Sequence, residues 1–193
     1  ETPGFLTQYT GFKNLEILAD MNGRISKADI RIVLKRVGLD PDMKKPVGKY
    51  SLGMRQRLGI AQAIMEDPLF LILDEPSAGL DPRGRDMIAE MISSYRKTTG
   101  STVIIVSHSM EDVAKSADKV LVMNKSEVEM FGTVNEVFSK VERLADIGLN
   151  VPQLTQIFLN LKHNGMAVRT DIYTIKNAEV ELLRLLREEG VLS

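Results

Sequence analysis

The sequence contains no cysteine, which excludes disulfide bonds, thiolate zinc sites and cysteine nucleophiles. It also lacks an excess of charge of one sign, because 25 basic residues stand against 26 acidic ones. No overall positive field therefore argues for binding to nucleic acid or to an anionic membrane surface. The apolar runs fall far short of the ~20 residues that a membrane span needs, and Glu1 opens a segment without the features of a signal peptide. We expect a cytoplasmic protein whose function depends on local sites.

What the sequence does contain is enough apolar material for a core: 44% of its 193 residues are hydrophobic. Two short, continuous apolar runs are typical of fully buried strands, and a helical pattern lies between them. A strand, a crossover helix and a second strand form a parallel unit, so the central part is predicted to be α/β. The runs are residues 69–73 and 102–107, and the helix between them is 84–96.

The flanking regions are predicted to be mainly helical. Ser26 and Ser51 are expected to be N-caps of two helices that precede the first strand. Residues 119–123 and 128–131 are two further predicted strands, and the turn between them lacks the glycine of a tight hairpin, so it is either strained or longer. The predicted helices that follow are residues 136–147, 152–163 and 178–189.

Two adjacent carboxylates, Asp74 and Glu75, end the first predicted strand. Parallel sheets bind ligands at this edge, so Asp74 could hold Mg²⁺ and Glu75 could act as a general base. Taken alone, the pair is better explained as two solvated acids at the end of a strand. The second strand ends at Ser107 and His108, which we expect to bring an imidazole to the same edge.

The third candidate element is the segment YSLGMRQRLGIAQA, in which Ser51 and a glycine open a helix. The free amides and positive dipole end of a helix favour a phosphate group. A simple capped helix is the more common explanation for such a segment on its own.

Together, YSLGMRQR, LILDEP, SAGLD and IIVSH resemble the nucleotide-binding subunit of ATP-binding-cassette (ABC) transporters over at least residues 50–123. The resemblance implies a P-loop NTPase fold that uses ATP and Mg²⁺. It also implies a head-to-tail dimer with a second ABC ATPase subunit, attached to transmembrane subunits at the cytoplasmic face of the membrane. No nucleic-acid partner is expected.

The resemblance also implies a role for each motif. Ser51, Leu52, Gly53 and Met54 fill the signature motif, which contacts the γ-phosphate of ATP bound mainly by the partner subunit; Leu52 and Met54 replace the usual glycine and glutamine. Asp74 would act on Mg²⁺ and Glu75 would be the catalytic glutamate. The loop from Ser77 to Asp81 would communicate across the dimer, and His108 would sense the γ-phosphate.

One part of the implied site has no counterpart in the sequence. No segment fits the phosphate-binding loop G-x-x-x-x-G-K-[ST], which the family carries upstream of the signature helix. Glu1 falls where the family has its Q-loop glutamine. We therefore expect a truncated fold that lacks the first strands and the phosphate loop, and a chain that is inactive alone.

Different parts of the sequence resemble different branches of the family. Residues 1–67 resemble ATPases that export bacitracin and lantibiotics, whereas residues 76–193 resemble ATPases of energy-coupling-factor importers. A join between two sources near residues 68–75 is one hypothesis.

The resemblance divides the chain into three regions. A partial Q-loop region with the signature helices covers residues 1–67, a RecA-like α/β part covers 68–132, and a helical accessory region covers 133–193. Two alternative functions stay open: a soluble ABC-type ATPase outside transport, and a non-catalytic folding or interaction unit.

Overall fold

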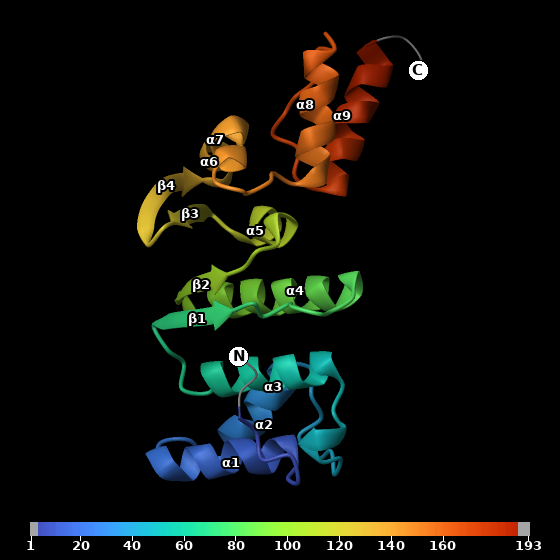
Figure 1. Cartoon of the computed structure of the whole chain (residues 1–193). Coiled ribbons are helices and arrows are strands. Elements are labelled where there is room, and N and C mark those ends of the chain that lie inside the picture. Colours follow the sequence, from blue (N-terminus) through green and yellow to red (C-terminus); the bar gives the residue numbers. More distant parts are fainter. Residues whose placement is uncertain (1–3, 189–193) are drawn as a thin grey trace. The chain divides into compact units, whose positions relative to one another are not determined.

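The computed structural model describes residues 4–188 and divides the chain into two compact units, one ending at Ser107 and the other beginning at His108 (Figure 1). The first unit has one hydrophobic core and the second unit has two smaller ones. The three regions predicted from the sequence, residues 1–67, 68–132 and 133–193, were defined by motifs and not by packing. That division stays a prediction.

The first unit begins with three helices: α1 (Gly11–Asn22), α2 (Lys27–Arg36) and α3 (Leu52–Ile64), with the short 3-10 helix η1 (Val47–Lys49) before α3. Ser26 and Ser51 are the N-caps of α2 and α3, as predicted, and each hydroxyl accepts a hydrogen bond from an amide three residues ahead. The apolar faces of these helices meet in one core, where Leu15, Leu34 and Leu58 are buried. Amphipathic spacing and caps thus account for this part of the fold.

A parallel strand–helix–strand unit follows, as the sequence predicts. β1 (Phe70–Asp74) pairs with β2 (Thr102–Val106), and α4 (Pro82–Thr99) connects them. The helix is longer at both ends than predicted, because the Asp81 carboxylate caps its start and Gly100, at φ +70°, ends it. Ile88, Ile92 and Tyr95 of α4 are buried in the same core as Leu71 and Leu73 of β1.

The prediction that both strands are buried on both faces is wrong. Only one face of the β1–β2 pair meets the core, so exposure alternates along each strand. The other face exposes Phe70 (68%), Ile72 (66%), Ile104 (47%) and Val106 (52%). The prediction rested on the continuous apolar runs, which are typical of strands covered on both faces. Among residues 4–188, no side chain covers the second face of the β1–β2 pair.

The second unit opens with α5 (Met110–Ser116) and the antiparallel pair β3 (Lys119–Asn124) and β4 (Glu127–Thr133). The turn between them is tight, with Asn124 paired to Glu127. Lys125 and Ser126 occupy it at φ +49° and +67°. The strained version of the turn is therefore the correct one of the two alternatives, since left-handed backbone favours glycine.

Four helices complete the unit: α6 (Val134–Phe138), α7 (Val141–Asp146), α8 (Gln153–His163) and α9 (Ile175–Glu188). The single helix predicted over 136–147 is wrong, because Lys140 leaves helical geometry at φ −90° and ψ 55°. Phe138 and Leu144 on either side of this break are both buried. α9 starts three residues earlier than predicted, because the Thr174 hydroxyl accepts a hydrogen bond from the Asn177 amide. Within residues 4–188, no helix combines the length and apolar character that crossing a membrane requires.

Candidate functional site

The carboxyl end of β1 carries the two predicted acids. Asp74 is the last residue of the strand, pairs in register with Val106 of β2, and is exposed. Glu75 follows at φ +45°, a left-handed conformation that costs a non-glycine residue roughly 1–3 kcal/mol. The Glu75 amide donates to the Val106 carbonyl at 2.9 Å, which extends the strand pairing by one residue and holds this conformation.

Ser107, at the end of β2, lies beside the second acid. Its hydroxyl donates to Glu75 Oε2 at 3.4 Å, a long hydrogen bond. The ends of the two strands therefore bring Asp74, Glu75 and Ser107 to one edge, where the sequence predicted them. Ser107 was predicted only as the residue before the histidine, and its contact with Glu75 was missed.

His108 follows Ser107 directly and is the first residue of the second unit. Its side chain is exposed. The role of His108 toward the γ-phosphate stays a prediction.

The N-terminal end of α3 holds the four residues of the predicted signature motif, which are Ser51, Leu52, Gly53 and Met54. The Ser51 hydroxyl accepts a hydrogen bond from the Met54 amide at 3.2 Å. A hydroxyl that accepts in this way keeps its own proton for donation, so Ser51 can cap the helix and still donate to a phosphate oxygen. This donor set is compatible with phosphate binding.

Arg57, one turn into α3, has a structural role that the sequence did not reveal. Its guanidinium donates from Nε to the Gly53 carbonyl at 3.3 Å and from Nη1 to the Gly38 carbonyl at 2.9 Å. Gly38 follows the C-cap of α2 and has a left-handed backbone, with φ at +67°. The arginine thus links the end of α2 to the start of α3 and fixes the signature segment.

The loop after β1, from Ser77 to Asp81, leads into α4. The Leu80 amide donates to the Ser77 carbonyl at 3.2 Å, and Gly79 lies at φ +71°. Asp81 Oδ1 accepts from the Gly84 amide at 2.8 Å, so this carboxylate is the N-cap of α4. Asp81 followed by Pro82 is a sequence signal for such a cap, which was not used in predicting the helix. The remaining candidate, Glu1, lies outside the described residues.

Asp74 is the candidate metal ligand. Its exposed carboxylate offers the hard oxygen atoms that Mg²⁺ prefers, and Mg²⁺ is commonly bound through one or two carboxylates with water and phosphate completing its shell. Within the described part of the chain, no group of three or more acidic or histidine side chains is placed to hold a metal by itself.

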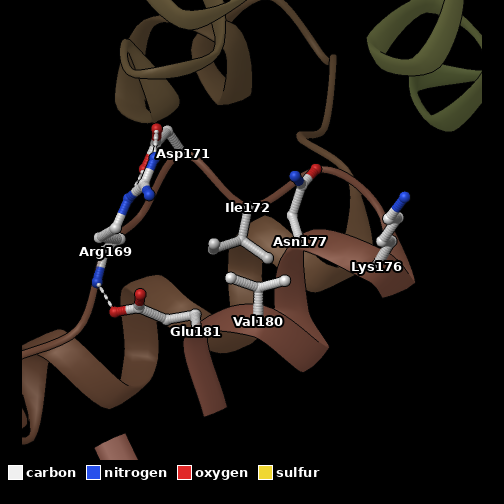
Figure 2. Close-up of a pocket in the computed structure, with 7 residues that line it drawn as sticks. All are labelled: Arg169, Asp171, Ile172, Lys176, Asn177, Val180 and Glu181. Carbon is white, nitrogen blue, oxygen red and sulfur yellow. Dashed lines mark hydrogen bonds and ion pairs between the residues drawn. The ribbon is translucent and has the colours of Figure 1, made fainter. Parts of the chain in front are cut away.

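A pocket in the second unit contains none of these residues (Figure 2). It lies between α9 and the segment before it, and Ile172 and Val180 form its apolar side. The Arg169 amide donates to Glu181 Oε1 at 2.8 Å, and the Arg169 guanidinium binds the Asp171 carboxylate at 2.6 and 3.0 Å. The Arg169 and Asp171 side chains pair with each other, and Glu181 accepts from the Arg169 backbone. These contacts attach α9 to the segment before it.

Known proteins resemble this chain over most of its length. The ABC transporter family matches residues 1–78. The energy-coupling factor transporter ATP-binding protein EcfA2 of Clostridium perfringens is 43% identical over 183 residues, which is 93% of this chain and 62% of that protein. The bacitracin transport ATP-binding protein BcrA of Enterococcus faecalis is 39% identical over 150 residues, 78% of this chain and 49% of BcrA.

Both predicted branches therefore occur among the relatives. The match to EcfA2 covers 183 residues and the match to BcrA covers 150 residues. Neither match fits within residues 1–67 or within residues 76–193 alone, so each relative resembles both parts of the chain. The join between two sources stays a hypothesis. The chain spans about half to three fifths of the length of these relatives.

Solved structures agree with the sequence matches. CbiO1 of Clostridium perfringens, described as part of the ABC transporter complex CbiONQ, superimposes with a TM-score of 0.65 at 29% identity, over 82% of this chain and 63% of that one. The ATP-binding cassette MJ0796, in a dimeric structure bound to ADP and phosphate, superimposes with a TM-score of 0.61 at 20% identity and supports the fold. Residues 1–78 therefore belong to the ABC transporter family, and most of the chain is similar to ATP-binding proteins of ABC transporters.

Proposed function

We propose that the chain serves as part of the nucleotide-binding subunit of an ABC transporter and couples ATP binding and hydrolysis to transport through transmembrane subunits. The observation that carries this proposal is the strained Glu75 beside Asp74 at the carboxyl edge of the parallel β1–β2 pair. Backbone strain of this kind is concentrated at functional sites. The similarity to EcfA2 and BcrA, which are both named as ATP-binding proteins of transporters, supports the same function.

A task is proposed for each of four residues: Asp74, Glu75, Ser107 and His108. Asp74 would hold the magnesium ion, which when bound polarises phosphoryl oxygens and offsets their charge. The Glu75 carboxylate would accept a proton from the attacking water. The Ser107 hydroxyl, 3.4 Å from Glu75 Oε2, would fix the direction of that carboxylate, and His108 would donate to the γ-phosphate.

The N-terminal end of α3 is proposed to act on a nucleotide held by another subunit. The Ser51 hydroxyl and the amides of residues 52–54 would donate to a γ-phosphate that the phosphate loop of a partner ABC subunit presents. A phosphate loop supplies most of the contacts to bound ATP, and no segment of this sequence fits that motif. The isolated chain is expected to show neither micromolar ATP affinity nor turnover that Glu75→Gln abolishes.

Pairing in solution tests this proposal. The chain is mixed with EcfA2 of Clostridium perfringens, which serves as the partner subunit, and association is followed by analytical ultracentrifugation with and without Mg-ATP. We expect ATP-dependent association that Ser51→Ala weakens at least about tenfold, the effect of losing one hydrogen bond to a charged group. Ser26→Ala is the matched control, because Ser26 caps α2 through an amide at the same distance of 3.2 Å. Equal loss in both variants would contradict a phosphate contact at Ser51.

Co-purification distinguishes transport from the alternative of a soluble ABC-type ATPase. We propose that the protein is peripheral at the cytoplasmic face of the membrane and is held there by transmembrane subunits. Co-expression with transmembrane subunits of an energy-coupling-factor importer or of a bacitracin exporter should recover the chain in the membrane fraction. Recovery only in the soluble fraction with both sets would favour the alternative function.

A further inference from the structure

Two leucine–glycine contacts join the N-terminal end of α3 to the loop that follows β1. A Cβ atom placed on Gly79 would lie 2.9 Å from Leu52 Cδ2, so the Leu52 side chain packs directly on this glycine. A Cβ atom placed on Gly53 would lie 3.5 Å from Leu80 Cδ2. Each leucine therefore lies against the glycine that neighbours the other leucine, and the two contacts are reciprocal.

The backbone on both sides of these contacts is fixed locally. Arg57 Nε donates to the Gly53 carbonyl at 3.3 Å, and Arg85 Nε donates to the Leu80 carbonyl at 3.2 Å. Ser51 and Asp81 cap the helices that start at each segment. Each segment is thus attached firmly to its own helix, and the leucine–glycine contacts are the apolar link between them.

The loop in turn is joined to the acids of β1. The Ala78 amide donates to the Glu75 carbonyl at 3.1 Å, and the Leu80 amide donates to the Ser77 carbonyl at 3.2 Å. These hydrogen bonds connect Leu80 through the turn to the backbone of Glu75, whose amide is held by the Val106 carbonyl. On its other side, Leu80 is connected through its contact with Gly53 to the segment that begins at Ser51.

We propose that Leu52 and Leu80 are positioning residues: their contacts with Gly79 and Gly53 make the signature end of α3 and the Asp74–Asp81 segment move as one body. A phosphate bound at Ser51 would then bias the position of Glu75, which lies on a different element. This consequence for nucleotides rests on the proposed function, whereas the mechanical coupling does not. A glycine at position 52 has no side chain with which to form the link.

Hydrogen exchange of the chain without nucleotide tests the coupling. Leu52→Ala should accelerate exchange of the Ala78 and Leu80 amides about fivefold, the lower end of typical coupling between sites. Exchange at Ala61, in the buried part of α3, should change little, which separates a positioning effect from general loss of stability. Leu52→Met should restore the slow rates. The control is Leu69→Ala, because Leu69 is 80% exposed and outside the contact.

A pair of glycines gives an independent test. Gly79 and Gly100 lie at φ +71° and +70°, but a Cβ atom on Gly100 would have no heavy atom within 4 Å. Both alanine substitutions incur the same backbone strain, and only Gly79→Ala also displaces Leu52. We expect Gly79→Ala to raise the unfolding equilibrium constant about fivefold more than Gly100→Ala, and the excess to disappear in a Leu52→Ala background. Equal effects of the two substitutions would overturn the contact.

The outcomes separate this inference from the proposed function. Unchanged exchange at Ala78 and Leu80 in Leu52→Ala refutes the coupling, whether or not the chain pairs with an ABC subunit. Faster exchange in that variant, together with absence of ATP-dependent pairing in the unmodified chain, refutes the nucleotide role and leaves the coupling standing. Faster exchange together with weaker ATP-dependent pairing in Leu52→Ala supports both.

Discussion

Two buried tyrosines of the first unit should respond in opposite directions to loss of their hydroxyl groups. Tyr95 of α4 is 2% exposed, and among the described residues its hydroxyl has no hydrogen-bond partner. Tyr50 is 6% exposed, and its hydroxyl accepts a hydrogen bond from the Gly11 amide at 3.3 Å. Phenylalanine removes one oxygen at each position and keeps the ring.

The expected magnitudes follow from these contacts. A buried hydroxyl without a hydrogen-bond partner costs about 1–3 kcal/mol of folding free energy, which Tyr95→Phe would recover. The substitution also loses the dispersion contacts of one oxygen atom, so we expect a net stabilisation of the first unit by about 1 kcal/mol. Arg36, whose guanidinium carbon lies 5.9 Å from the Tyr95 ring centroid, keeps its contact. Tyr50→Phe leaves the Gly11 amide buried and unpaired, which should cost about 1 kcal/mol.

Urea unfolding followed at amide signals of the first unit measures both effects. The two variants should differ by about 2 kcal/mol, or roughly 30-fold in the unfolding equilibrium constant. If both substitutions destabilise the unit to the same extent, the Tyr95 hydroxyl makes a favourable interaction and the prediction for Tyr95→Phe is wrong.

Three further predictions concern the second unit. Ser126→Gly should stabilise it by about 1 kcal/mol in thermal unfolding, because glycine relieves the left-handed backbone at φ +67°. Leu144→Ala, at a side chain that is 0% exposed, should cost about 3 kcal/mol in urea unfolding. The Arg184 guanidinium holds the pKa of the buried Glu181 carboxyl below its ordinary value of 4.5. This stabilisation should be complete above that value and be lost as pH falls through the lower folded pKa, and Glu181→Gln should remove this pH dependence.

Local signals in the sequence predict much of this fold. Ser26 and Ser51 cap α2 and α3 as expected, and Asp29 completes a capping box with Ser26. The parallel pairing of β1 and β2 follows from two apolar runs with a helix between them. These features depend on residues close together in the sequence, and periodicity and caps report on such residues directly.

Features that depend on distant contacts could not be predicted in this way. The left-handed Glu75 is held by the Val106 carbonyl of another strand, and no residue type near Glu75 indicates it. The Leu52 contact with Gly79 joins segments that are far apart in the sequence. The exposed face of Phe70 and Ile72 was missed because an apolar run reports hydrophobicity on both faces and not what covers them.

Comparing Mg-ATP with Mg-ADP in the pairing experiment with EcfA2 shows whether the start of α3 recognises the γ-phosphate of a nucleotide held by another ABC subunit. The two nucleotides differ only in that phosphate group. We expect the chain to associate with EcfA2 in Mg-ATP and to associate at least about tenfold more weakly in Mg-ADP, and we expect Ser51→Ala to lose this difference. Equal association in both nucleotides, or a difference that Ser51→Ala leaves unchanged, would mean that Ser51 does not recognise the γ-phosphate.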